Sequence, residues 1–165
     1  MTTDDFLRVL LSIDFPEKYW SLCDRYSSSP TNTYTGQKAE VLAAFRALGI
    51  EPRYDGRDRS YVVEAEKIDE IEWSALFAKQ RHSQELMISG VGPSGRVGSN
   101  FATLAYDAKL LSDPGFSRSP FSGPRPYPRP QVADAAALVG LVQEFVVLVH
   151  EIKAALRARM TRNDT

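Results

Sequence analysis

The chain has 165 residues, of which 43% are apolar and 25% charged, a composition typical of one folded globular domain. Twenty Lys and Arg residues stand against 21 Asp and Glu residues, so the net charge is −1. This balance lacks the positive excess that favours nucleic acid or an anionic membrane as a partner. The single cysteine excludes an internal disulfide and a zinc site built from several thiolates. We therefore expect one domain over residues 1–165 that binds neither nucleic acid nor membrane; the oligomeric state stays open.

The first fifty residues predict three short helices. The first has Thr3 as its expected N-cap and two acidic residues in its first turn, where they suit the helix dipole. The second is expected from Pro16 to about residue 26, because proline fits the first turn of a helix. The third is expected over residues 37–48 and ends at Gly49, which suits a left-handed C-cap.

Residues 52–90 predict a meander of about four antiparallel strands. The Asp55-Gly56 turn signal, followed by a run of β-branched and aromatic residues, indicates a hairpin. Residues 71–79 alternate between apolar and polar side chains as a strand does, but they include enough good helix formers that a helix remains an alternative. Residues 85–89 predict the next strand.

Residues 90–98 are rich in glycine and predict a loop. Asn100 then suits the N-cap of a helix over residues 101–111, although apolar alternation in the same stretch leaves a strand as the competing interpretation. Six prolines between residues 112 and 130 predict an extended strap over the surface, because proline breaks both helices and central strands.

Residues 131–160 predict one long helix with a continuous apolar stripe. The stripe consists of Leu138, Leu141, Val142, Phe145, Leu148, Val149, Ile152 and Leu156. Three further valines widen it, namely Val139, Val146 and Val147, so we expect neighbours on two sides and charged last positions that project into water. The fold class is therefore α+β, with the antiparallel sheet packed against the N-terminal helices and this long C-terminal helix.

The N-terminus is acidic where a secretory signal would be basic. The longest apolar stretch, residues 138–149, is interrupted by Gln143 and Glu144 and is expected to be too short to span a bilayer. We therefore expect a cytoplasmic protein.

The sequence contains one match to a nucleotide-binding motif. Gly90, Gly92 and Gly95 match G-x-G-x-x-G, whose glycines allow a tight turn and close approach to a pyrophosphate. Pro93 removes a backbone N–H from this loop, and no βαβ unit follows, so a simple strand-to-helix connection is favoured. A small-ligand or nucleotide-binding protein, or an enzyme, using the loop of residues 90–98 remains an alternative function.

No catalytic, metal or cofactor motif is recognisable. The two histidines, His82 and His150, lack the second helical histidine that would complete H-E-x-x-H, and no G-x-S-x-G sequence surrounds a serine. We therefore expect a non-enzymatic protein without metal or cofactor.

An acidic run between residues 64 and 72 has two interpretations. It is either a solvated edge or a negative docking surface, since complementary charge speeds and selects association. In the second interpretation the partner-binding residues are Glu64, Glu66, Asp69, Glu70 and Glu72, with Trp73 as an aromatic anchor.

A winged-helix DNA-binding regulator is a further alternative. The helix over residues 37–48 and the hairpin after it have the order of a recognition helix and a wing. However, the helix carries Glu40 beside Lys38 and Arg46, and the hairpin's arginines are offset by acidic residues, so a basic face is lacking.

Residues 70–160 resemble, in general character, the immunity proteins of bacterial polymorphic and contact-dependent toxin systems. The resemblance is carried by the strand of residues 85–89, by residues 95–105 (GRVGSNFATLA) and by residues 127–130 (YPRP) before a helix. It implies a cytoplasmic protein that neutralises a cognate toxin by direct occlusion, and it assigns no residue a role.

Overall fold

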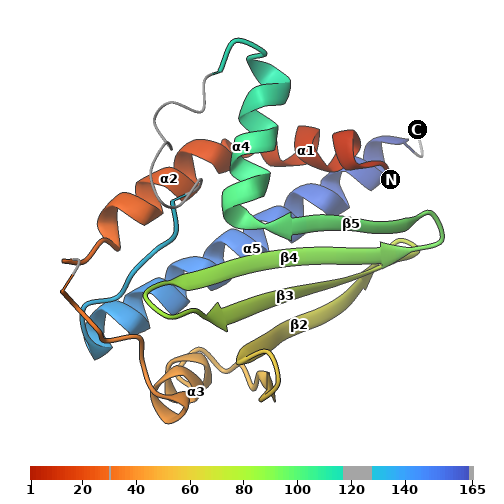
Figure 1. Cartoon of the computed structure of the whole chain (residues 1–165). Helices are drawn as coiled ribbons and strands as arrows, with labels where there is room; N and C mark the ends of the chain where they lie inside the picture. Colours follow the sequence, from red (N-terminus) through yellow and green to blue (C-terminus); the bar gives the residue numbers. More distant parts are fainter. Residues whose placement is uncertain (30, 117–127, 164–165) are drawn as a thin grey trace.

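The computed structural model describes residues 1–29, 31–116 and 128–163, and Figure 1 shows their arrangement. Within these residues the chain forms five helices and five strands. In chain order they are α1 (Thr3–Leu11), α2 (Phe15–Arg25), α3 (Lys38–Arg46), β1 (Arg53–Asp55), β2 (Ser60–Ile68), β3 (Ile71–Lys79), β4 (Gln84–Gly92), β5 (Gly95–Asn100), α4 (Phe101–Ser112) and α5 (Ala135–Asn163). The predicted α+β class and long C-terminal helix are confirmed.

The strands form one sheet in which each strand pairs antiparallel with the next along the chain. Residues 71–79 are strand β3 and not a helix, because they pair along their whole length with β4 and bury alternate apolar side chains. The sheet has one strand more than predicted. The added strand, β5, uses residues that the sequence assigned to the glycine-rich loop.

The prediction of a loop over residues 90–98 is wrong, because these residues form the β4–β5 hairpin. Gly90 and Gly98 allow neighbouring atoms to pack closely against the backbone of this hairpin. A Cβ atom on Gly90 would lie 2.6 Å from Cγ2 of Ile71, and one on Gly98 would lie 2.3 Å from the carbonyl oxygen of Ile88. Gly98 also has a φ of +96°, which favours glycine. Glycine inside a strand marks a close approach of neighbouring atoms, although in a sequence it resembles loop composition.

Side-chain caps set the beginnings of α1 and α4. Thr2, one residue before the predicted Thr3, caps α1: its hydroxyl accepts the N–H of Asp5 at 3.1 Å, and the Asp5 carboxylate accepts the N–H of Thr2 at 3.0 Å. Asn100 caps α4 as predicted, since its Oδ1 accepts the N–H of Thr103 at 2.8 Å. Residues 101–111 are therefore helical, and the strand alternative for them is wrong.

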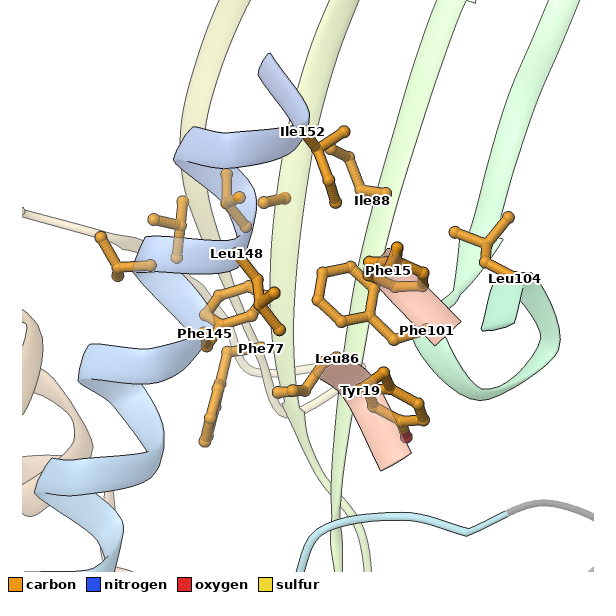
Figure 2. Packing of buried hydrophobic residues seen from close by; sticks show 14 of the residues in the cluster. Phe15, Tyr19, Phe77, Leu86, Ile88, Phe101, Leu104, Phe145, Leu148 and Ile152 are labelled. Atoms are coloured by element: carbon orange, nitrogen blue, oxygen red, sulfur yellow. The ribbon is translucent and has the colours of Figure 1, made fainter. Parts of the chain in front are cut away.

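The helices cover one face of the sheet, and α5 passes behind the strands in Figure 1. Figure 2 shows Phe145 of α5 against Phe77 of β3, with ring centroids 5.8 Å apart. Phe101 of α4 lies 5.7 Å from Phe145 and meets Phe15 of α2 edge-to-face at 5.1 Å. All four rings are buried. Because aromatic pairs stabilise beyond their buried area, this cluster joins three helices and the sheet in one hydrophobic core.

The predicted stripe of α5 is buried along its whole length. It comprises Leu138, Leu141, Val142, Phe145, Leu148, Val149, Ile152 and Leu156. Val146 is buried as well, but Val139 and Val147 are 40% and 55% exposed, so the wider face predicted for this helix is only partly covered. The helix begins at Ala135, later than the predicted residue 131, and Oδ1 of Asp134 accepts an N–H of its first turn.

The charged C-terminal part of α5 does not project freely into water, contrary to expectation. Arg159 donates a hydrogen bond to the Asp5 carboxylate at 2.6 Å. Arg157 and Lys153 both pair with Glu66 of β2. These contacts hold the end of the helix against α1 and the sheet.

Among the described residues, the segment Ala135–Arg159 is the one helix long and apolar enough to cross a membrane by length and composition. We had expected the apolar stretch to be too short to span a bilayer because Gln143 and Glu144 interrupt it. The length and composition of the helix do not bear this out. Its apolar stripe is packed inside the protein, and the core helix of a soluble protein meets the same criterion.

Residues 117–127 of the predicted proline-rich strap lie outside the described residues. The end of the segment contacts core elements through its carbonyl groups. The oxygen of Pro128 accepts the hydroxyl of Tyr19 at 2.9 Å, and the oxygen of Pro130 accepts the N–H of Gln84 at 2.9 Å. The chain thus passes α2 and the start of β4 before it enters α5.

Replacing Gly98 by Ala is expected to destabilise the protein more than replacing Gly95 by Ala. Both glycines have positive φ, +96° and +108°, so both variants share a conformational cost of about 1–3 kcal/mol. Only at Gly98 would the new Cβ meet the backbone of β4, because nothing lies within 4 Å of the equivalent atom at Gly95. Chemical denaturation should show Gly98→Ala to be the less stable variant by about 1 kcal/mol or more. Equal losses would contradict the pairing of β5 with β4.

Candidate partner-binding surface

The acidic segment forms the hairpin of β2 and β3, with Asp69 and Glu70 in its turn. Asp69 has a φ of +57°, as tight hairpin turns require. A β-bulge between Val63 and Glu66 shifts the register of β2, and Glu64 lies in this bulge. The side chain of Glu64 lies outside the description. Because of the bulge, Glu66 points toward the helices, and the predicted acidic residues do not all share one surface.

Glu66 is paired with α5. Its carboxylate lies 3.4 Å from Nζ of Lys153 and accepts a hydrogen bond from Arg157. The hydrogen bond from Arg157, assisted by Lys153, holds the pKa of Glu66 below its ordinary value. The side chain of Lys153 is only 1% exposed, whereas that of Glu66 is 36% exposed. Glu66 therefore compensates a buried cation, a role in the fold that the sequence analysis did not foresee.

Trp73 cannot act as the surface anchor that the sequence analysis predicted, because it is 0% exposed. Its ring centroid lies 5.0 Å from that of Phe6 in α1. Gly90, its partner in β4, leaves room for the ring. Strand alternation shows that Trp73 and Phe77 share a face, but it does not show that this face is the one that the helices cover.

Three of the predicted acidic residues remain at the surface and together form what we call the acidic turn: Asp69, Glu70 and Glu72. All three are exposed, and within the described residues none of them forms an ion pair. Glu72 lies opposite Lys67 in the hairpin register. Uncompensated carboxylates of this kind attract a basic partner and speed its association.

The sheet has a second face, here called the open face, which no described helix covers. In Figure 1 this face lies in front of α5. Val62 of β2 lies opposite Leu76 of β3, which in turn lies opposite Met87 of β4. These three side chains are half-buried and stand apart from the hydrophobic core, and Val91 of β4 is 51% exposed. Since an antiparallel sheet commonly presents polar side chains on its solvated face, an apolar row across three strands indicates a contact surface.

Charged side chains lie on the same face, four residues along β3 and β4 from this apolar row. Glu72 of the acidic turn lies opposite Val91, which lies opposite Arg96 of β5. An apolar centre with a charged rim is the usual composition of a protein–protein interface. This surface cannot be recognised in the sequence, because only the strand register brings its members together.

A groove of about 420 Å³ lies between α2 and α5. Val147 contributes an exposed apolar side chain to it. Two ion pairs bridge the same two helices across the groove, Lys18 with Glu151 at 2.7 Å and Arg25 with Glu144. The bridging pairs identify the groove as a seam between packed helices, and the open face is the stronger candidate for a partner.

The described residues offer no metal centre, since no group of three or more His, Cys, Asp or Glu side chains is placed to hold an ion. Cys23 is buried, and burial raises the pKa of its thiol to about 12, so it is protonated at neutral pH and a weak nucleophile. His82 is exposed in the loop between β3 and β4, and His150 is exposed on α5.

The segments that suggested the two alternative functions are parts of the sheet. The segment of residues 90–98 is a β-hairpin, so its glycines do not form a loop that leads into a helix and cradles phosphate. The supposed wing consists of β1 and β2, two strands of the five-stranded sheet, and α3 packs beside α5.

No protein-family model matches the chain, and no curated protein or solved structure matches it at a significant level of similarity. The assignment of a function therefore depends on the chemistry of the surface.

Replacing Glu66 by Gln is expected to destabilise the protein by about 1–2 kcal/mol. Breaking a fully buried ion pair costs about 3–5 kcal/mol, and the partial exposure of Glu66 reduces this cost. The folded-state pKa lies below the ordinary 4.5, so the stabilisation is fully present above that pH and is lost as the pH falls through the lowered value.

Urea denaturation at several pH values measures this effect. The difference in unfolding free energy between the wild type and Glu66→Gln should be largest above pH 4.5 and shrink in acid. Glu70→Gln, an exposed control in the same hairpin, should change stability by less than about 0.5 kcal/mol. A difference that is independent of pH would argue against the pairing with α5.

Proposed function

We propose that this protein acts by binding a partner protein on the open face of its sheet. The observation that supports this is the apolar row of Val62, Leu76 and Met87 on a face that the described helices leave uncovered. The exposed Val91 lies on the same face, four residues along β4 from Met87. Apolar side chains at the centre of an interface supply most of its binding energy when they are desolvated. A soluble protein that gains nothing from this row would be expected to carry polar residues there.

The charge of the surface favours a partner with a basic patch. The acidic turn adjoins the open face, because Glu72 lies opposite Val91. Its three carboxylates have no cation paired to them among the described side chains. A basic partner would therefore be drawn to the acidic turn and would dock its apolar residues on the neighbouring row.

The resemblance to toxin immunity proteins suggests the class of partner. We infer that the protein is a non-catalytic, cytoplasmic immunity protein and that it occludes the active surface of a toxin domain. Occlusion requires only a stable complex, and a continuous sheet face provides a rigid platform for one.

If the adjacent gene encodes the partner, replacing Val91 by Lys is expected to weaken the complex with that gene product by at least about tenfold, or about 1.4 kcal/mol. A lysine there adds positive charge opposite Glu72 and removes an apolar contact. Val147→Lys is the matched control, because Val147 is similarly exposed, at 55% against 51%, but lies on α5. Calorimetry measures both affinities, and survival of cells that produce the partner measures protection.

Two results would oppose the proposal. If the adjacent gene product neither forms a complex with the wild-type protein nor harms cells that lack it, the immunity function is wrong. If Val147→Lys weakens the complex and Val91→Lys does not, the partner binds the groove between α2 and α5 and not the open face.

A further inference from the structure

A polar cavity of about 560 Å³ lies at the end of the sheet opposite the acidic turn. The turn between β1 and β2 meets the loop after β3 there, and the N–H of Lys79 donates to the carbonyl oxygen of Arg59 at 3.2 Å. The cavity is lined by Thr35, Arg57, Asp58, Arg59, Lys79, Gln80 and Arg81. We propose that this cavity binds a small anion that carries several phosphate groups.

The cations of the cavity lack negative partners. Four of the seven lining residues are basic, and only Asp58 is acidic. Arg57, Arg59 and Arg81 form no ion pair with any described side chain, in contrast to the arginines of α2 and α5. Like charges gathered in one concave site repel one another, and the field that they create attracts a multivalent anion.

The backbone around the cavity is held in place before any ligand arrives. Nζ of Lys79 donates to the carbonyl oxygen of Gly36 at 2.6 Å, which fixes the adjoining loop. Oδ1 of Asp55 accepts the N–H of Arg57 at 2.9 Å and so fixes the turn. Arg59, at the end of the turn between β1 and β2, has a left-handed φ of +50°, as Asp69 has in the turn between β2 and β3.

The lining selects the class of anion. Guanidinium groups match the oxygens of phosphate in pairs, and a volume of 560 Å³ lies within the range of about 300–1,000 Å³ that is common for small-molecule sites. No aromatic side chain lines the cavity, so a nucleobase has nothing to stack on. The ligand is therefore recognised through its phosphates and not through a base.

The position of the cavity argues against a nucleic acid strand. Nine-residue strands at about 3.3 Å per residue place the cavity about 30 Å from the acidic turn. A nucleic acid would need a basic track along the surface, whereas the four cations of the cavity gather at one end of the sheet and the net charge of the protein is −1.

Isothermal titration with inorganic tripolyphosphate, ATP, adenosine and a mixed-sequence DNA strand of about 12 nucleotides tests the proposal. Tripolyphosphate and ATP should bind with similar affinity, adenosine should not bind, and the DNA strand should bind no more tightly than tripolyphosphate. Raising the salt concentration from about 50 to about 200 mM should weaken binding, because the attraction is ionic.

The variant Arg57→Gln/Arg81→Gln should weaken tripolyphosphate binding by about tenfold or more, since it removes two of the four cations. Arg8→Gln/Arg46→Gln is the matched control: it removes the same charge from exposed sites outside the cavity and should change binding by less than about twofold. If the first variant fails to fold, NMR of the wild type should show ligand shifts at residues 57–59 and 79–81. The result is independent of the partner-binding surface.

Three outcomes would overturn the proposal. These are the absence of tripolyphosphate binding at about 1 mM, equal weakening by the two double variants, and tighter binding of the DNA strand than of tripolyphosphate. The last outcome would assign the cavity to nucleic acid instead.

Discussion

The packing of α5 against one face of the sheet is the contact on which the rest of the molecule depends. Phe145 and Phe77 meet at its centre, and Phe101 and Phe15 extend the same cluster into α4 and α2. Because the helices all gather on this face, the other face is left to the solvent or to a partner. The same asymmetry leaves Val62, Leu76 and Met87 half-buried on the open face.

Long regular patterns were readable from the sequence, and features that depend on tertiary contacts were not. The stripe of α5 was predicted correctly because helical spacing persists over many turns. β5 was missed because Gly95 and Gly98 imitate a loop, although the backbone of β4 requires glycine at Gly98. Trp73 was correctly predicted to lie in a strand with alternating side chains, but it was predicted to be exposed and is buried. Alternation does not reveal which face of a sheet is covered.

In the candidate sites, too, some features could be predicted from the sequence and others depend on tertiary contacts. The acidic residues can be recognised in the sequence. The bulge before Glu66 and the pairing of Glu66 with the buried Lys153 are features of the folded structure. The apolar row of the open face exists only through the strand register. The basic cavity joins residues 57–59 to residues 79–81, which are distant in sequence and adjacent only because β2 pairs with β3. The two ends of this hairpin carry opposite charge, so a partner and an anion would be drawn to different ends of one molecule.

The order of the strands has a consequence for how the protein can associate. In a simple meander the first and last strands lie at the edges, and here these are β1, with three residues, and β5, with six. β1 pairs only with residues 60–62, so residues 63–68 of β2 form the rest of that edge, and the β-bulge between Val63 and Glu66 interrupts them. Short edges, one of them interrupted by glycines, offer few free backbone groups in a row, so another chain cannot readily extend the sheet. Self-assembly through strand addition is thereby disfavoured, and recognition is directed to side chains on the face of the sheet.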